Sequence, residues 1–301
     1  MTAIKLLGFP RSGTSLLQRL LATHPEIYAP PETYLFSGCA RMMRESSGEG
    51  PDLGMLTGLQ FSGFDEADIL DRIRRFAFSF LEEAAEKAGK PTWAEKSAFD
   101  IFDLSEIEEL LAGHCKFVCV VRHPLDVISS MKELTDQMGQ NVPEMRPWMA
   151  VHDNFYLAWA AAWRDLTTGL LAMKARLGDD AILCRYEDLV TAPKETLTQI
   201  TRLAGVADYI GTAQPNTTQI GLGDWKVFET TEVSQKSVSR WRRSLPRSSA
   251  KAAIEIVSPL MADLGYEVPR VSAPANRAQR IRQYKIAKAL TISAVNKTDT
   301  A

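Results

Sequence analysis

Short, almost continuously apolar runs alternate along this sequence with longer segments in which apolar residues recur every three or four positions. The clearest runs lie at residues 4–9, 115–121 and 181–185, and a shorter segment at 92–96 ends in polar residues. Continuous apolar strands are typical of a parallel sheet that is covered on both faces. The pattern therefore predicts an α/β fold with three layers, in which a central, mostly parallel sheet has helices on both faces.

Helices are predicted where the apolar period fits a helix and where glycine or proline marks an end. They are expected at residues 14–23, 68–87, 104–112, 155–176, 194–204 and 248–264, with a further helix beginning at Pro124. Residues 41–65 are rich in glycine and polar residues, so a flexible insertion is expected there. Residues 138–147 are expected to form a loop.

Composition excludes several classes of protein. The 301 residues include 35 basic and 37 acidic side chains, a net charge of −2, so there is no broad positive field for nucleic acid. No apolar run reaches the roughly 18 residues of a transmembrane segment, and the first residues do not resemble a signal peptide. The four cysteines have no zinc-site spacing, and Cys115 and Cys119 are interpreted as core residues. We therefore expect a cytoplasmic protein without a metal site.

The strongest chemical signal is a glycine-rich loop between the first strand and the first helix. Residues 8–15 read Gly-Phe-Pro-Arg-Ser-Gly-Thr-Ser. A loop in this position presents backbone N–H groups and the positive end of a helix dipole to an anion. The glycine spacing matches a Walker loop, but Thr14 replaces its lysine, and Arg11 supplies the positive charge instead. Hydroxyl donors come from Ser12, Thr14 and Ser15.

Four segments, in this order, resemble the PAPS-dependent sulfotransferase family, and within it the bacterial, protein-tyrosine and carbohydrate branch. They are residues 8–17, Val120 to Ser130, Arg185-Tyr186-Glu187-Asp188-Leu189 and Arg240-Trp241. The resemblance implies a P-loop-like fold. It also implies PAPS (3′-phosphoadenosine 5′-phosphosulfate) as co-substrate, PAP (3′,5′-ADP) as product and no metal. By the same resemblance, the donor is expected to contact Arg11, Ser12, Gly13, Thr14, Ser15, Arg122, Ser130, Tyr186, Lys236, Ser237 and Arg240.

The resemblance also implies the groups that carry the reaction. Glu32 follows two prolines at the position of the family's catalytic glutamate, and it is the expected general base. Lys96 and Arg11 are expected to stabilise negative charge on the reacting groups. His152 is the rival base, since other sulfotransferases use a histidine. The segment that would correspond to the one carrying that histidine, residues 95–99, contains no histidine here. A solvated loop glutamate and a plain surface lysine remain the alternatives for Glu32 and Lys96.

The expected activity is in-line, metal-independent transfer of a sulfuryl group to a hydroxyl or amine of a small-molecule, glycan or lipid acceptor. A P-loop small-molecule kinase or phosphotransferase, and a catalytically silent nucleotide-binding module, stay open, as does a homodimer. We expect one sulfotransferase domain at residues 1–268. Insertions at about 37–67 and 132–154 are expected to form the acceptor pocket. The polar, basic tail at 269–301 is expected to be a peripheral helix or partly disordered.

Overall fold

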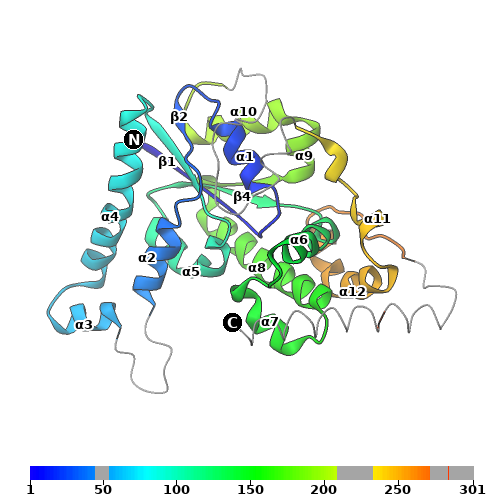
Figure 1. Cartoon of the computed structure of the whole chain (residues 1–301). Helices are drawn as coiled ribbons and strands as arrows, with labels where there is room; N and C mark the ends of the chain where they lie inside the picture. Colours follow the sequence, from blue (N-terminus) through cyan, green and yellow to red (C-terminus); the bar gives the residue numbers. More distant parts are fainter. Residues whose placement is uncertain (45–53, 209–232, 272–283, 285–301) are drawn as a thin grey trace. The chain divides into compact units, whose positions relative to one another are not determined.

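The predicted parallel sheet is present and matches the expected α/β class. A computed structural model describes residues 1–44, 54–208, 233–271 and 284 (Figure 1). Within that part of the chain, five strands pair in parallel in the order β2-β3-β1-β4-β5. They are β1 (Thr2–Gly8), β2 (Ile27–Tyr28), β3 (Thr92–Lys96), β4 (Lys116–Val121) and β5 (Ala181–Arg185). All of the predicted strands are confirmed, and the two-residue β2 is an addition too short to leave an apolar run in the sequence.

Two compact units share the chain, and their residues alternate along the sequence. The sheet unit comprises Met1–Gly8, Gly13–Val121 and Gly169–Ser234, and the second unit comprises Phe9–Ser12, Arg122–Thr168 and Gln235–Ala301. The helices of the sheet unit are α1 (Thr14–Leu21), α2 (Leu35–Met43), α3 (Met55–Phe61), α4 (Glu66–Lys87), α5 (Leu104–Leu111), α9 (Tyr186–Thr191) and α10 (Pro193–Ala204). The second unit contains α6 (Pro124–Met138), α7 (Arg146–Val151), α11 (Trp241–Ser244) and α12 (Arg247–Asp263), while α8 (Phe155–Leu177) has residues in both.

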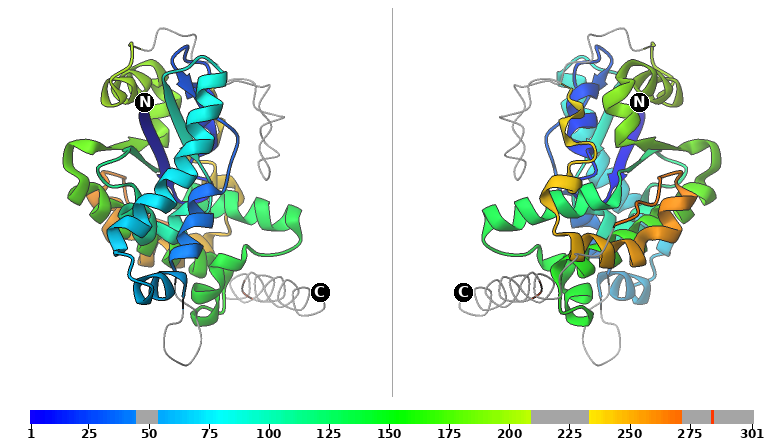
Figure 2. Two further views of the ribbon diagram at one scale, coloured as in Figure 1. Left: turned by 90° about the vertical axis from the view of Figure 1, so that its left-hand side faces the viewer. Right: turned by 90° about the vertical axis from the view of Figure 1, so that its right-hand side faces the viewer.

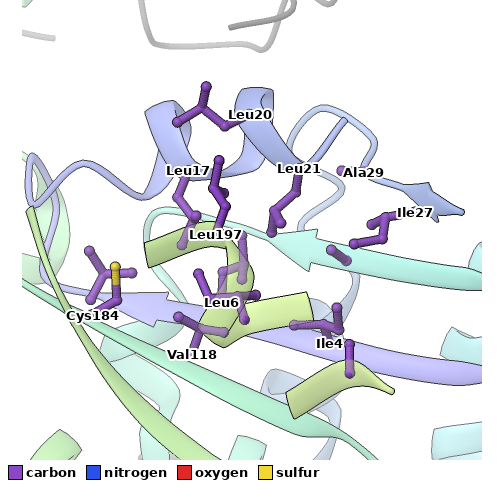
Figure 3. Packing of buried hydrophobic residues seen from close by; sticks show 14 of the residues in the cluster. Ile4, Leu6, Leu17, Leu20, Leu21, Ile27, Ala29, Val118, Cys184 and Leu197 are labelled. Atoms are coloured by element: carbon purple, nitrogen blue, oxygen red, sulfur yellow. The ribbon is translucent and has the colours of Figure 1, made fainter. Parts of the chain in front are cut away.

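One face of the sheet is covered by α1 and α10. Side chains alternate along a strand, so Ile4 and Leu6 of β1 point to the same face. There they join a buried cluster with Val118 of β4, Leu17 of α1 and Leu197 of α10 (Figure 3). The short helix α1 is amphipathic, and its leucines supply the helical side of this cluster. Burial of these leucines therefore fixes the helix that follows the glycine loop.

The opposite face of the sheet is covered by α2, α4 and α5. Trp93 of β3 is fully buried. The ring of Phe36 of α2 is stacked on it with 6.2 Å between the ring centroids, and the ring of Phe78 of α4 meets it edge-on with 5.1 Å between the centroids. Helix α4, the long cyan helix, runs in front of the strands in the left view of Figure 2. The sheet unit thus has the predicted three layers.

Two segments expected to be irregular are partly helical. Residues 55–61 form α3, inside the segment 41–65 that was expected to be a flexible insertion, and α7 begins at Arg146, inside the expected loop 138–147. The glycines that suggested a loop include Gly58, which lies within α3 with nothing near the position of a side chain. An exposed helix tolerates such a glycine at a cost of about 1 kcal/mol. Part of the insertion 37–67 and most of the tail 269–301 lie outside the described residues.

All four cysteines are buried and form no disulfide. Burial raises the pKa of Cys119 and of Cys184 to about 12, and it also raises the pKa of Cys39 and of Cys115. The interpretation of Cys115 and Cys119 as core residues is confirmed. Among the helices that the structure describes, none has the length and apolar character to cross a membrane.

A cluster of charged side chains is buried beside the aromatic layer of the sheet unit, by which we mean the packed rings of Phe36, Phe78 and Trp93. The ammonium of Lys5, in β1, forms ion pairs with both Glu95 and Asp100, and all three side chains are fully shielded from solvent. Burial acts to lower the pKa of Lys5, but the two carboxylates hold it above its ordinary value. Burial raises the pKa of Asp100 to about 6, against the opposing effect of Lys5. Each charge in this cluster is tolerated because its partner is present.

Replacing Lys5 with methionine should therefore destabilise the protein. Lys5→Met leaves two buried carboxyl groups without their cation, and the loss of one partner from a buried ion pair costs about 3–5 kcal/mol. Urea unfolding followed by circular dichroism measures the change. Lys87→Met is the matched control, because Lys87 is exposed and pairs with Glu83 on its own helix. Equal effects of the two substitutions would contradict the prediction.

Candidate functional site

Three of the predicted site residues meet at the carboxyl end of β3 in the sheet unit. Lys96, the last residue of β3, forms an ion pair with Glu32 and donates a hydrogen bond to the hydroxyl of Ser15 at 2.8 Å. Ser15 lies in the first turn of α1, where the helix dipole favours negative charge. The Lys96 side chain is only 3% exposed and that of Glu32 10%, so solvent screens this ion pair weakly. The structure therefore groups a carboxylate, an ammonium and a hydroxyl beside a helix N-terminus.

A residue that the sequence analysis did not select holds the second oxygen of Glu32. The hydroxyl of Tyr34 donates to Glu32 Oε2 at 2.6 Å. Burial raises the pKa of Tyr34, and the hydrogen bond to Glu32 raises it further, so the phenol stays protonated as a donor. Tyr34 has a left-handed backbone with φ of 55°, and its N–H donates to Ser97 Oγ at 2.9 Å. The loop that carries Glu32 is thus fixed on both sides of the carboxylate.

Gly13 and Tyr186 contact each other in the same unit. Gly13 has a φ of 99°, and a side-chain carbon placed on it would lie 2.3 Å from the ring of Tyr186. Both the backbone conformation and the close approach therefore require glycine here. The ring of Tyr186 is buried, and Thr14 beside Gly13 is buried as well. The predicted adenine contact of Tyr186 stays a prediction.

The second unit contains Arg122 and Ser130, which the resemblance assigns to the 3′-phosphate of the donor, and Arg11 of the glycine loop. Arg11 donates from Nε to the hydroxyl of Ser130 at 3.1 Å. Arg122 donates from Nη1 to the carbonyl of Arg11 at 3.0 Å and from Nη2 to the carbonyl of Ser237 at 2.8 Å. Two guanidinium groups and one hydroxyl thus lie within one hydrogen-bonded group. The carbonyl contacts also mean that Arg122 shapes the backbone of this unit.

The segment that carries Arg240 is held by a carboxylate of α6. Asp126 is buried and accepts hydrogen bonds from the N–H groups of Ser239 at 2.7 Å and Trp241 at 2.9 Å. Arg240 forms an ion pair with Glu133. Burial lowers the pKa of Arg240, and the charge of Arg122 lowers it further, which indicates crowded positive charge. Lys236 lies in the short 3₁₀ helix Gln235–Ser237.

The hydroxyl of Ser12 tests whether the loop suits an anionic ligand. Its oxygen is buried and has no hydrogen-bond partner among the described residues. A buried hydroxyl without a partner costs about 1–3 kcal/mol, and such groups are found where a ligand completes the hydrogen bonding. The residues of the glycine loop therefore fit a phosphosulfate group, whose oxygens accept hydrogen bonds.

The rival base, His152, belongs to the second unit. It follows α7 and is partly exposed. Within 1–44, 54–208, 233–271 and 284, no three His, Cys, Asp or Glu side chains lie close enough to hold a metal ion. Glu32 contacts Lys96 directly and Ser15 through Lys96, so of the two candidate bases it is the one grouped with other predicted site residues in the described part of the chain.

The fold and the match to a known family agree. A parallel α/β sheet with a glycine loop between β1 and α1 is a P-loop-like fold. Residues 3–209 match the model of the sulfotransferase family. This match covers more than half of the chain, and the chain belongs to the sulfotransferase family.

Individual relatives are distant. The nodulation protein NoeE of Sinorhizobium fredii is 28% identical over 280 residues, covering 87% of this chain. The alignment spans only 65% of the length of NoeE, just under two thirds. Protein-tyrosine sulfotransferase 1 of Danio rerio is 24% identical over 291 residues, which cover 91% of this chain and 74% of that protein.

Solved structures support the fold. The sulfotransferase domain from the curacin biosynthetic pathway aligns with a TM-score of 0.57 and 22% identity, covering 89% of this chain and 99% of that domain. The sulfotransferase domain of the Synechococcus PCC 7002 olefin synthase gives a TM-score of 0.56 and 22% identity, covering 89% of this chain and 95% of that domain. At these identities the likeness concerns the fold alone.

Sequence reasoning did not select Tyr34, Ser97 or Asp126 as residues of the site. The sequence could have indicated Asp126, since this residue lies in the motif that also contains Arg122 and Ser130. Tyr34 and Ser97 each lie two residues or fewer from a predicted residue, Glu32 or Lys96. Their contacts join segments about 60 positions apart, and a single sequence does not reveal such a pairing.

The contact of Gly13 with Tyr186 predicts a large effect of a single methyl group. Gly13→Ala should lower the free energy of unfolding by about 1–3 kcal/mol more than Gly89→Ala, because overpacking adds to the backbone strain. Gly89 is the matched control, with φ of 66° and open space around it. Denaturant unfolding measures both variants. The extra loss should shrink when Tyr186→Ala is combined with Gly13→Ala, and an unchanged loss would disprove the steric explanation.

Proposed function

We propose that this chain transfers the sulfuryl group of PAPS to a hydroxyl or amine acceptor, without a metal, with Glu32 as general base. The observation that carries the proposal is the group formed by Glu32, Lys96 and Ser15 at the N-terminus of α1. A carboxylate can accept the acceptor's proton, and an ammonium and a helix N-terminus can stabilise developing negative charge.

Donor contacts are proposed within each unit by itself. In the sheet unit, Gly13, Thr14 and Ser15 would supply backbone N–H groups and hydroxyls to the phosphosulfate. In the second unit, Arg11, Arg122 and Ser130 would bind the phosphates, because forked guanidinium donors suit phosphate oxygens. The hydroxyl of Ser12, which has no hydrogen-bond partner within the described residues, supports this assignment. Further donor contacts are proposed for Tyr186, Lys236, Ser237 and Arg240.

Lys96 is proposed to have two successive partners. In the structure its ammonium is paired with Glu32, and this ion pair holds the carboxylate in place. PAPS supplies the activated sulfuryl group when it is bound. Lys96 would then turn toward the charge that develops on the leaving phosphate, and Glu32 would take the proton of the attacking hydroxyl or amine.

The acceptor is proposed to be a small molecule, a glycan or a lipid, and a phenol is the first class to test. The relative from Danio rerio is named a protein-tyrosine sulfotransferase, which motivates phenolic acceptors. A phenol ionises at a pKa near 10, so a carboxylate base is useful but need not supply the whole driving force. No described helix could cross a membrane, and we propose a cytoplasmic location.

Two measurements test the proposal directly. Calorimetric titration should show that PAP binds more tightly than ATP, because ATP lacks the 3′-phosphate. Incubation with PAPS and a panel of phenols, sugars and amines, followed by mass spectrometry, should show one product that has gained SO₃. Tight ATP binding with Mg²⁺-dependent phosphate transfer, and no sulfated product, would overturn the proposal in favour of a kinase.

Arg122→Ala should weaken the binding of PAP far more than that of AMP. Losing a charge-assisted hydrogen bond to phosphate costs roughly 1.5–3 kcal/mol, or about ten- to a hundred-fold in affinity. Calorimetry with both nucleotides measures the difference. Arg243→Ala is a surface control of the same charge change. Equal losses for PAP and AMP would mean that Arg122 acts through the carbonyls of Arg11 and Ser237 rather than through the ligand.

Glu32→Gln should retain PAP affinity and lose turnover. Glutamine has nearly the same shape but cannot accept a proton at neutral pH, and general-base catalysis contributes about 10²–10⁴-fold. The rate constant kcat should fall by that factor, while Kd for PAP changes only a few-fold. His152→Ala is the paired variant. Near-normal turnover of Glu32→Gln beside an inactive His152→Ala would make His152 the base.

A further inference from the structure

The loop that carries Glu32 is bound residue by residue to the end of β3. Glu32 pairs with Lys96, the hydroxyl of Thr33 donates to Glu95 Oε1 at 2.8 Å, and the N–H of Tyr34 donates to Ser97 Oγ at 2.9 Å. Three consecutive loop residues thus contact three consecutive residues at 95–97. Because neighbouring strand residues face opposite sides, the contact of Thr33 lies on the other side of the strand from that of Glu32.

The acceptor of the Thr33 hydrogen bond is itself fixed. Glu95 is fully buried, its Oε2 receives the ammonium of Lys5, and its Oε1 also accepts from Ser97 Oγ at 2.8 Å. Burial acts to raise the pKa of Glu95, but Lys5 and the hydroxyl donors hold it below its ordinary value. An ionised carboxylate in this place is a strong acceptor for the Thr33 hydroxyl. The chain of contacts runs from Lys5 through Glu95 to the residue next to Glu32.

We propose that Lys5, Glu95 and Thr33 are positioning residues that hold the Glu32 carboxylate where it meets its acceptor. This inference rests on the proposed function, in which Glu32 is the base. The hydroxyl of Thr33 makes two hydrogen bonds: it donates to the buried carboxylate of Glu95 and accepts from the backbone N–H of Leu35 at 3.3 Å. A displaced loop would move the base, and small displacements of a reacting group reduce turnover strongly.

The test replaces the hydroxyl of Thr33 without changing its volume. Thr33→Val should lower kcat about 10- to 100-fold, as expected if the loss of one hydrogen bond to a charged group falls on turnover, while Kd for PAP stays within two-fold. Thr33→Ser keeps the hydroxyl and should retain most of the turnover. The assay measures ³⁵S transfer from labelled PAPS to tyramine, and thermal unfolding confirms that each variant is folded.

A double substitution separates positioning from general stability. If Thr33 acts through the carboxylate, Thr33→Val should lower the residual rate of Glu32→Gln by less than two-fold. An undiminished effect of Thr33→Val in that background would refute the positioning role.

A crystal structure of Thr33→Val gives a readout that needs no activity. We expect the Glu32 carboxylate to move away from Lys96 in the variant, and an unmoved carboxylate would also overturn the inference. A wild-type protein that binds no PAP and transfers no sulfuryl group would instead count against the proposed function. The crystal structure would still show whether Thr33 fixes the loop, so the two failures are distinguishable.

Discussion

The alternation of side chains at the end of β3 is the constraint on which the sheet unit depends. Glu95 points to the face of the aromatic layer and Lys96 to the face of α1, so one strand end serves a buried ion cluster and the candidate site at once. Lys5, on the neighbouring strand, supplies the cation that offsets the free-energy cost of burying the Glu95 carboxylate. Stability and the placement of Glu32 therefore draw on the same two residues of one strand.

The glycine loop shows a second constraint, which is conformational. Arg11 and Gly13 both have positive φ, 71° and 99°. For glycine this costs nothing, but for arginine the left-handed region costs of order 1–3 kcal/mol. Hydrogen bonds at both ends of the residue offset the strain, because Ser130 accepts from its side chain and its carbonyl accepts from Arg122. Strained backbone conformations cluster at binding and catalytic sites, and Arg11 lies in the candidate anion-binding loop.

The fold could be predicted from the sequence wherever the chain is buried on both sides. β1 and β4 read as continuous apolar runs because they lie in the middle of the sheet, and Pro124 marked the start of α6 because proline suits a first turn. By contrast, β2 has only two residues, and α3 contains a glycine that suggested a loop. Local pattern is a poor guide where packing elsewhere decides the conformation.

The candidate site could be predicted only as a set of residues, without its contacts. Arg11, Ser130 and Arg122 were selected from their motifs, and the structure joins them by hydrogen bonds. Glu32 and Lys96 were selected separately, and their ion pair came only with the fold. Glu95, which accepts the hydrogen bond of the Thr33 hydroxyl, lies 62 positions away, and sequence spacing carries no information about such a contact. The sequence therefore predicts which residue types take part in the site, but it does not predict how their side chains contact one another.

The burial of all four cysteines also bears on how this protein can be labelled. Alkylating reagents react with the thiolate, and a buried thiol with a raised pKa offers them almost none at neutral pH. A cysteine introduced at an exposed position, such as Phe61 with 86% of its surface accessible, would therefore react far ahead of the native thiols. The wild-type background thus accepts a site-specific fluorophore or spin label without prior removal of its own cysteines.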